Sequence, residues 1–302
     1  MKLLLTGAFN YSEEQIVKIK SLGHEIVFIQ DERVSLQIDI TDIEAVVCNG
    51  LFLYNDITMF KSLKFIQLTS AGLDRVPLDY IKKNGIKLFN AKGVYSVPMA
   101  EWVVLKILEI YKKSRFFYKN QEQYKWEKQR NLLELTDRTA SIIGYGSVGS
   151  EVAKRLKAFG VNIISVDRQK REDECVDEAL LIDELNYALG KADIIILTLP
   201  LSDKTRHLIN KDKISKMKEN AVLINVSRGG IIDEARLIEA LKADKFLGVA
   251  LDVFEEEPLV KSSLWNFENI IITPHISYIS NKVNERLFEL IVANLSYIKY
   301  LH

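Results

Sequence analysis

The 302-residue chain carries 41 basic and 41 acidic residues, and this zero net charge gives no overall attraction to nucleic acid or to an anionic membrane. Hydrophobic residues make up 48% and charged residues 27% of the chain, as in an ordinary globular protein long enough for two domains. With no apolar stretch near the roughly 18 residues of a membrane span, and two cysteines without metal-ligand spacing, we expect a cytoplasmic protein that binds neither membrane, nucleic acid nor metal.

Short apolar runs alternate with helix-like segments from the first residues onward. This pattern is typical of an α/β protein with parallel sheets. A helix is expected between an N-cap at Ser12 and Gly23. The strands expected in this first unit are 2–5, 25–29, 45–47, 65–68 and 87–89.

Segment 97–117 is a long helical run that is apolar nearly all round, with Pro98 at a first-turn position. A helix of this kind should be buried on most sides. We therefore expect a bridging or interface helix, wedged between two domains of the chain or also packed across a dimer interface. The polar segment 119–130 is expected to be solvated.

A second α/β unit follows, and a last amphipathic helix is expected at 284–300. That helix could return to the first unit and make it discontinuous. The strands expected in the second unit are 141–143, 161–166, 194–199, 221–226, 249–253 and 270–273.

A glycine-rich turn joins the first strand of this unit to its first helix and fits the pattern G-x-G-x-x-G. The first glycine permits a tight turn, the second lets the backbone approach a pyrophosphate, and the third lets the helix pack on the strand. A plain turn without a ligand is the alternative, but the flanking strand and helix favour a dinucleotide site. The residues of the turn are Gly144, Tyr145, Gly146, Ser147, Val148 and Gly149.

Asp167 ends the next strand, where an acid binds the adenosine ribose hydroxyls. Its carboxylate favours NAD because it repels a 2′-phosphate. Arg168, Lys170 and Arg171 could instead neutralise such a phosphate, or form a solvated run opposite the acidic stretch 172–184. We expect these three basic side chains to be solvated and not to bind a phosphate.

Three side chains follow later strands and together form a set suited to hydride transfer. Arg228 can hold a carboxylate through its planar fork, His275 can move a proton, and Glu257 can keep that imidazole protonated. Taken alone, each of these residues has an ordinary alternative role. Arg228 could be a surface arginine, Glu257 one of three solvent-facing glutamates, and His275 a structural histidine. Asp252, at another strand end, could accept from a carboxamide or close a turn. The set points to reduction of a 2-keto acid.

Five motifs give the chain a resemblance to the D-isomer-specific 2-hydroxyacid dehydrogenases along nearly its whole length. They are TSAGLD at 69–74, GYGSVG at 144–149, NVSRGGIID at 225–233, LDVFEEEPL at 251–259 and TPHIS at 273–277. The resemblance implies that Arg228, Glu257 and His275 are catalytic. It implies substrate contacts at Ser70, Ala71, Gly72, Tyr95, Arg228 and His275. Cofactor contacts are implied at the glycine-rich turn, Asp167, Arg168, Leu199, Pro200, Thr205, Val226, Ser227, Arg228, Asp252 and His275.

The same resemblance implies two doubly wound parallel-sheet domains in a homodimer that uses NAD. A Rossmann cofactor domain at 98–276 is inserted in a flavodoxin-like substrate domain made of 1–97 and 277–302. In the family, the helix corresponding to 97–117 also packs across a two-fold dimer interface, which would bury its remaining apolar face.

Two departures from the family bear on the substrate. Segment 47–50 has no basic residue where phosphoglycerate enzymes commonly carry an arginine, and Trp102 stands where the family often has histidine. The first counts against a phosphorylated substrate, although Arg75, Lys92 or Arg115 could supply a cation instead. Residues 49–54, Tyr95 and the region around Tyr278 are expected to line the pocket, and their uncharged, partly aromatic character suggests a small or apolar side group. An NAD(H)-sensing regulatory or scaffold protein of the same fold is the alternative function. A formate dehydrogenase fits less well, because it needs a smaller anion pocket.

Overall fold

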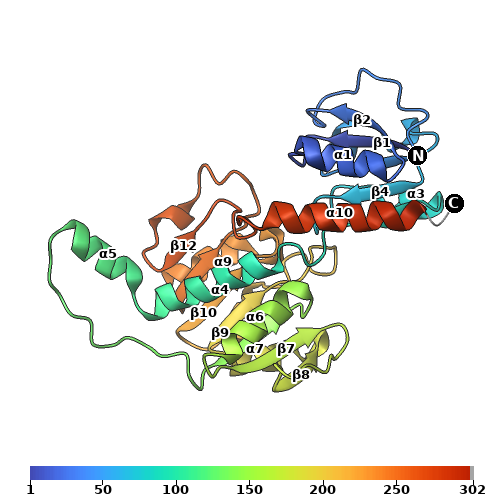
Figure 1. Cartoon of the computed structure of the whole chain (residues 1–302). Coiled ribbons are helices and arrows are strands. Elements are labelled where there is room, and N and C mark those ends of the chain that lie inside the picture. Colours follow the sequence, from blue (N-terminus) through green and yellow to red (C-terminus); the bar gives the residue numbers. More distant parts are fainter. Residues whose placement is uncertain (300–302) are drawn as a thin grey trace. The chain divides into compact units, whose positions relative to one another are not determined.

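The computed structural model describes residues 1–299 and consists of two compact units (Figure 1). Unit 1 comprises Met1–Tyr95 and the chain from Ser280 on, and unit 2 is Ser96–Ile279. The sequence places these boundaries at 97 and 277. Each unit is built on one sheet in which every neighbouring pair of strands is parallel. The expected fold class, two doubly wound parallel-sheet domains, is thereby confirmed.

Unit 1 has a five-stranded sheet in the order β2-β1-β3-β4-β5. The order reverses between β1 and β3, so the carboxyl ends of these two strands flank the switch point of the sheet. The strands are β1 (Lys2–Thr6), β2 (Glu25–Ile29), β3 (Ala45–Cys48), β4 (Phe65–Leu68) and β5 (Lys87–Phe89). The helices are α1 (Glu13–Ser21), α2 (Leu51–Tyr54), the 3-10 turn η1 (Ile57–Met59), α3 (Leu78–Lys83) and α10 (Val283–Lys299).

The first and last helices of unit 1 follow the sequence closely. Ser12 caps α1 in a reciprocal capping box with Gln15, as its N-cap position predicts. Helix α10 buries Leu287, Ile291 and Leu295 in the core that also contains strand β1. Residue 300, the last of the helix predicted at 284–300, lies outside the described residues.

Unit 2 has a seven-stranded sheet in the order β12-β11-β10-β9-β6-β7-β8. Its switch point falls between β6 and β9, where a doubly wound sheet binds a dinucleotide. The strands are β6 (Thr139–Ile143), β7 (Asn162–Asp167), β8 (Glu178–Leu181), β9 (Ile194–Leu197), β10 (Ala221–Asn225), β11 (Phe246–Leu251) and β12 (Ile270–Ile272). The helices and 3-10 turns are α4 (Ser96–Tyr111), α5 (Ser114–Glu122), α6 (Ser147–Lys157), η2 (Ile182–Glu184), α7 (Leu185–Lys191), α8 (Lys211–Lys216), η3 (Gly229–Ile231), α9 (Glu234–Lys242) and η4 (Ser263–Asn266).

Two features of unit 2 correct the sequence-based expectations. The strand β8 was not expected, because it is a short edge strand that lies in an acidic stretch and pairs with β7 alone. The prediction of a single helix at 97–117 is wrong. The segment forms two helices, α4 and α5, which are separated at Lys113, where a left-handed φ of 51° interrupts the helical conformation. The guanidinium of Arg115 then donates to the carbonyls of Phe267, Glu268 and Ile270, which fixes the new direction of α5.

Helix α5 continues into the segment 119–130, which was expected to be solvated, and ends at Glu122. In Figure 1 this helix and the chain after it extend beyond the sheet of unit 2. Tyr124 and Trp126 in this extension are 99% and 97% exposed. No helix within residues 1–299 has both the length and the apolar character needed to cross a membrane.

Candidate active site

The glycine-rich turn of unit 2 shows why glycine stands at each of its three positions. Gly144 has a φ of +94°, and a Cβ there would lie 2.5 Å from the backbone nitrogen of Leu199. A Cβ on Gly149 would lie 2.7 Å from the carbonyl oxygen of Gly144, so only glycine lets α6 pack this closely. A Cβ on Gly146 would meet nothing within 4 Å. The open side of the turn is therefore at Gly146, where a pyrophosphate can approach the backbone.

Helix α6 begins directly after this open glycine. Gly146 is its N-cap, and no side chain accepts from the N–H groups of the first turn. A helix that begins without a side-chain cap can offer its first N–H groups, here those of Ser147 and Val148, to phosphate oxygens. The turn thus fits the phosphates of NAD. The ring of Tyr145 is only 2% exposed and packs in the core, so its backbone is the part suited to a cofactor contact.

Thr198 fixes the turn from the neighbouring strand, and sequence reasoning missed it. Its hydroxyl donates to the carbonyl oxygen of Gly144 at 2.6 Å and also lies 3.3 Å from that of Ile143. The available signal was a single polar residue inside the expected apolar strand 194–199. Its role depends on the parallel pairing of β6 with β9.

Asp167 ends β7, as predicted, and its carboxylate accepts from the backbone N–H of Arg168 at 2.6 Å. Arg168 is exposed and forms no ion pair with any described residue. Lys170 lies 3.5 Å from Glu184 in an exposed ion pair. The basic run is therefore partly paired with the acidic stretch, and Asp167 is the charged group at the strand end.

We expect kcat/KM to be higher with NADH than with NADPH, by roughly tenfold or more, because Asp167 repels a 2′-phosphate. Measuring both cofactors with one active keto acid tests this preference. Asp167→Ser should narrow the difference, and Lys191→Ser, at an exposed ion pair with Glu178 in the same unit, serves as the control. A wild-type preference for NADPH would instead make Arg168 a phosphate ligand.

Arg228 follows β10 in a loop that is held by one buried side chain. Asn225 is fully buried, and its Nδ2 donates to the carbonyl oxygen of Arg228 at 3.0 Å. Its Oδ1 accepts from the backbone N–H of Ser227 at 3.0 Å and from the Ser227 hydroxyl at 2.7 Å. Asn225 therefore acts as a positioning residue. The sequence did not single it out, because an asparagine at the end of an apolar strand has many ordinary roles.

The next residue brings the Arg228 loop against the loop after β11. A Cβ on Gly229 would lie 1.8 Å from the backbone carbonyl carbon of Phe254, so the backbones of the two loops are in contact there. The backbone N–H of Phe254 donates at 3.0 Å to Oε1 of Glu257. This contact places the loop that bears Arg228 beside the loop that bears Glu257.

The three consecutive glutamates, which the sequence could not distinguish, have different partners. Glu255 lies 2.9 Å from Nε2 of His207, and Glu256 is exposed. Oε2 of Glu257 lies 2.8 Å from Nδ1 of His275. Glu257 is thus the glutamate that faces the predicted proton donor.

The pKa of Glu257 lies below its ordinary value through a balance of opposing effects. Partial burial by itself raises this pKa. The hydrogen bond with His275, the N–H of Phe254 and the positive charges of His275 and Arg228 lower it and outweigh the burial. Glu257 is therefore ionised at neutral pH and can stabilise a protonated imidazole.

Asp252 organises the loop that carries His275. The carboxylate is fully buried and accepts from the hydroxyl of Thr273 at 2.5 Å and from the backbone N–H groups of Ile276 and Ser277 at 2.9 and 2.8 Å. The Asp252 carbonyl accepts the N–H of His275 at 2.9 Å, and His275 has a left-handed φ of 54°. These bonds do not close a turn at the end of β11; they hold the loop after β12, 21–25 residues further along the chain. The carboxamide contact stays a prediction.

The Glu257→Gln variant should lower kcat/KM for keto-acid reduction by roughly tenfold or more. Glutamine keeps the volume and can still contact Nδ1 of His275, but it lacks the negative charge that stabilises an imidazolium proton donor. In the wild type, the lowered pKa of Glu257 keeps this carboxylate ionised to below the ordinary value of 4.5, so its contribution is lost only as pH falls through that lowered pKa. Glu256→Gln is the matched control, and an equal loss of kcat/KM in both variants would contradict this role.

The remaining predicted cofactor residues lie around the carboxyl ends of β9 and β10. Leu199 and Val226 are buried, and Pro200 is exposed. The hydroxyl of Thr205 donates to the Pro200 carbonyl at 2.8 Å, so this threonine closes the turn after Pro200. Their contacts with a cofactor stay predictions.

The predicted substrate loop belongs to unit 1, after β4. Its carbonyls are held internally: Asn90 Nδ2 donates to Ala71 at 2.6 Å, the Ser70 hydroxyl donates to Gly72 at 3.2 Å, and the Tyr95 hydroxyl donates to Thr69. Tyr95, expected to contact substrate, thus supports the loop in this structure. The contacts of Ser70, Ala71, Gly72 and Tyr95 with a substrate stay predictions.

Known proteins are similar to this chain in both sequence and fold. Residues 104–277 match the family model described as D-isomer specific 2-hydroxyacid dehydrogenase, NAD binding domain. A hydroxypyruvate reductase from Thermotoga maritima is 35% identical over 231 residues, which cover 75% of this chain and 74% of that protein. A D-3-phosphoglycerate dehydrogenase from Methanocaldococcus jannaschii is 34% identical over 91% of this chain, which spans about half (53%) of that protein's length.

Solved structures extend the similarity to the whole chain. The D-lactate dehydrogenase from Aquifex aeolicus, complexed with NAD and lactic acid, has a TM-score of 0.78 and 28% identity, and the match covers 99% of this chain and 96% of that one. A glyoxylate reductase from Paecilomyes thermophila has a TM-score of 0.85 and 25% identity, over 97% and 94% of the two chains. The chain therefore belongs to the D-isomer-specific 2-hydroxyacid dehydrogenase family and carries that family's NAD-binding domain.

Proposed function

We propose that this protein reduces a 2-keto acid to the D-2-hydroxy acid with NADH. The observation that carries the proposal is the bonded pair of Glu257 and His275 in the same unit as the glycine-rich turn. The Arg228 loop, which touches the Glu257 loop, supplies the cation for a carboxylate. Family membership supports the same chemistry.

In the proposed reaction, bound NADH supplies a hydride to the keto carbon, and the electron pair of the carbonyl bond moves to oxygen. Arg228 holds the carboxylate of the substrate and polarises the keto oxygen. His275, as an imidazolium, donates the proton that this oxygen needs and becomes neutral. Glu257 keeps the imidazole oriented through Nδ1 and stabilises its protonated form before transfer. Reprotonation of His275 from solvent completes the cycle.

For the substrate, we propose that the backbone of Ser70, Ala71 and Gly72 also binds the carboxylate. Backbone N–H groups in such a loop suit an anion. Residues 49–54 and Tyr95 are assigned to the side group of the substrate. The uncharged character of these residues favours a small or apolar group.

A screen of NADH oxidation tests the function and narrows the substrate. Glyoxylate, hydroxypyruvate, pyruvate, and branched and aromatic keto acids should be compared at equal concentration. We expect turnover with at least one uncharged-side-chain acid and none when Arg228 is replaced by alanine. NADH binding without turnover on any of them would favour the alternative, an NAD(H)-sensing regulatory protein.

We also propose that the protein is a homodimer formed through unit 2. Helix α4 buries Val103, Ile107 and Tyr111 in its own core but leaves Leu105 49% exposed. Next to it, a groove is lined by side chains of α4, α5 and the β12 region. The extension after α5 exposes Tyr124 and Trp126 almost completely. A two-fold partner could cover this surface isologously.

Light scattering coupled to size exclusion, at low micromolar protein, should give twice the monomer mass of 34.6 kDa. Trp126→Ser should weaken the dimer, because it removes a large exposed ring from the proposed interface. Tyr187→Ser, at an exposed tyrosine on α7, is the control. A wild-type mass near 34.6 kDa would contradict the proposal.

A further inference from the structure

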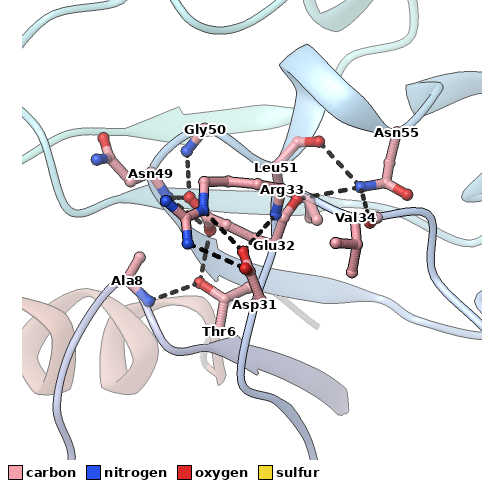
Figure 2. A network of polar contacts seen from close by, with 10 residues as sticks. All are labelled: Thr6, Ala8, Asp31, Glu32, Arg33, Val34, Asn49, Gly50, Leu51 and Asn55. Atoms are coloured by element: carbon pink, nitrogen blue, oxygen red, sulfur yellow. Dashed lines mark hydrogen bonds and ion pairs between the residues drawn. The ribbon is translucent and has the colours of Figure 1, made fainter.

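Glu32 is a buried carboxylate at the carboxyl edge of the unit 1 sheet. It is 8% exposed and follows β2. Figure 2 shows the donors that converge on it: the Thr6 hydroxyl at 2.6 Å, the Asn49 N–H at 3.1 Å and the Gly50 N–H at 2.5 Å. All three donors come from strand ends other than its own. The carboxylate therefore ties together the ends of β1, β2 and β3.

These donors stand at the switch point of the sheet. Thr6 is the last residue of β1, and Asn49 and Gly50 follow β3, which is the pair of strands between which the order reverses. Open parallel sheets bind ligands at this position. A hydroxyl with two successive backbone N–H groups forms a concave set that suits an anion. In this protein the group that occupies these three donors is the side-chain carboxylate of Glu32.

No lysine, arginine or histidine side chain within residues 1–299 forms an ion pair with this carboxylate. The neighbouring Arg33 bonds to Asp31 instead, at 2.9 and 3.0 Å, and interacts with Glu32 only at longer range. Burial foremost raises the pKa of Tyr11 and of Cys48, and the nearby carboxylate of Glu32 contributes to both. The carboxylate is therefore held by neutral hydrogen-bond donors and not by a salt bridge.

The loop held by Glu32 lies next to the predicted carboxylate-binding loop of the same unit. The Cys48 carbonyl, at the end of β3, accepts the N–H of Thr69 at 2.8 Å. Strands β3 and β4 are neighbours in register, so 49–50 and 69–72 leave the sheet side by side. An anionic side group on a substrate bound at 70–72 would thus approach donors that are already occupied, beside a fixed negative charge.

We propose that Glu32 is a specificity-determining residue, an internal anion that fills the switch-point donors and excludes substrates with a second anionic group. The part that concerns substrates rests on the proposed function. The part that concerns the donors does not, because anion binding can be measured without turnover. The two parts are therefore tested separately.

The first test asks whether an external anion can replace the carboxylate. Glu32→Ala leaves three donors and a small void, and it should lower the melting temperature more than Asp31→Ala, which removes a half-exposed charge one residue away. Propionate or inorganic phosphate, at ionic strength matched with NaCl, should raise the melting temperature of Glu32→Ala selectively by mass action. Equal effects on Glu32→Ala, Asp31→Ala and the wild type would overturn the donor assignment. If the alanine variant does not fold, Glu32→Asp replaces it in this comparison, because the shorter side chain withdraws the carboxylate from the three donors and leaves room for an external anion.

The second test compares hydroxypyruvate with its phosphate ester as substrates. Glu32→Gln should shift the ratio of kcat/KM values toward the phosphate ester by roughly tenfold or more, whereas Asp31→Asn should leave the ratio unchanged. An unchanged ratio in an active Glu32→Gln enzyme would overturn the specificity role. If the wild type reduces no keto acid, the proposed function fails, and the anion test alone decides whether Glu32 is an internal anion.

Discussion

Replacing His275 by asparagine is expected to lower kcat by roughly 10²–10⁴-fold, the usual worth of a general acid. The imidazole is the group that donates the proton, and asparagine can keep a hydrogen bond to Glu257 but cannot transfer a proton. NADH affinity should change little, because the glycine-rich turn and Asp167 bind at other strand ends of unit 2. The measurement combines steady-state rates with a fluorescence titration of NADH.

His207→Asn is the matched control for that variant. His207 belongs to the same unit and also faces a glutamate, with its Nε2 2.9 Å from Glu255, but it has no assigned part in the reaction. Its kcat should stay near the wild-type value. A His275→Asn enzyme that keeps more than about a tenth of wild-type kcat would show that another group delivers the proton.

Arg228→Lys is expected to raise KM for the keto acid and to lower kcat, with a loss in kcat/KM of roughly 10²-fold or more. Lysine keeps the charge but lacks the planar fork that binds a carboxylate through two parallel hydrogen bonds. Because the arginine contacts both the bound substrate and the developing charge on oxygen, both kinetic constants should change.

Arg236→Lys is the control for the arginine. Arg236 lies on the exposed surface of α9, where it pairs with Glu239, and the substitution there should leave both constants unchanged. Wild-type kinetics in Arg228→Lys would mean that the carboxylate is held by other groups. The backbone loop at 70–72 would then be the candidate.

Most of the structural features that the sequence predicted correctly are buried strands and the turn at the glycine-rich motif. Buried parallel strands such as β9 (Ile194–Leu197) are continuous apolar runs, so their composition and length are enough to identify them. The left-handed turn at Gly144 and the tight packing at Gly149 are local steric demands that the motif records directly. The edge strand β8 could not be predicted, because it has only four residues, follows a run of acidic residues and pairs with β7 alone.

Tertiary contacts explain the other failures. The break of the 97–117 helix at Lys113 carries no glycine or proline, and the direction of α5 depends on bonds from Arg115 to a distant loop. In the same way, nothing in the sequence near Glu32 indicates that its donors come from two other strand ends. Long-range pairing of this kind is visible only when the sheet order is known.

Some residues of the candidate site could be predicted from the sequence and others could not. Residue types and strand ends indicated Arg228 and His275, but the three adjacent glutamates could not be distinguished until family resemblance selected Glu257. The structure provides the physical reason for that selection, a 2.8 Å contact with the imidazole. Asn225 and Asp252 hold the reacting residues in place, and their roles depend on loops that meet only in the folded chain.

Hydride transfer from NADH to the keto carbon, with formation of the D product, is tested most directly with NADH deuterated at the transferable C4 position and one reducible keto acid. We predict deuterium at C2 of the product and D configuration, with the label absent when unlabelled NADH is used in deuterated water. Protium at C2 with labelled NADH, or an L product, would contradict it.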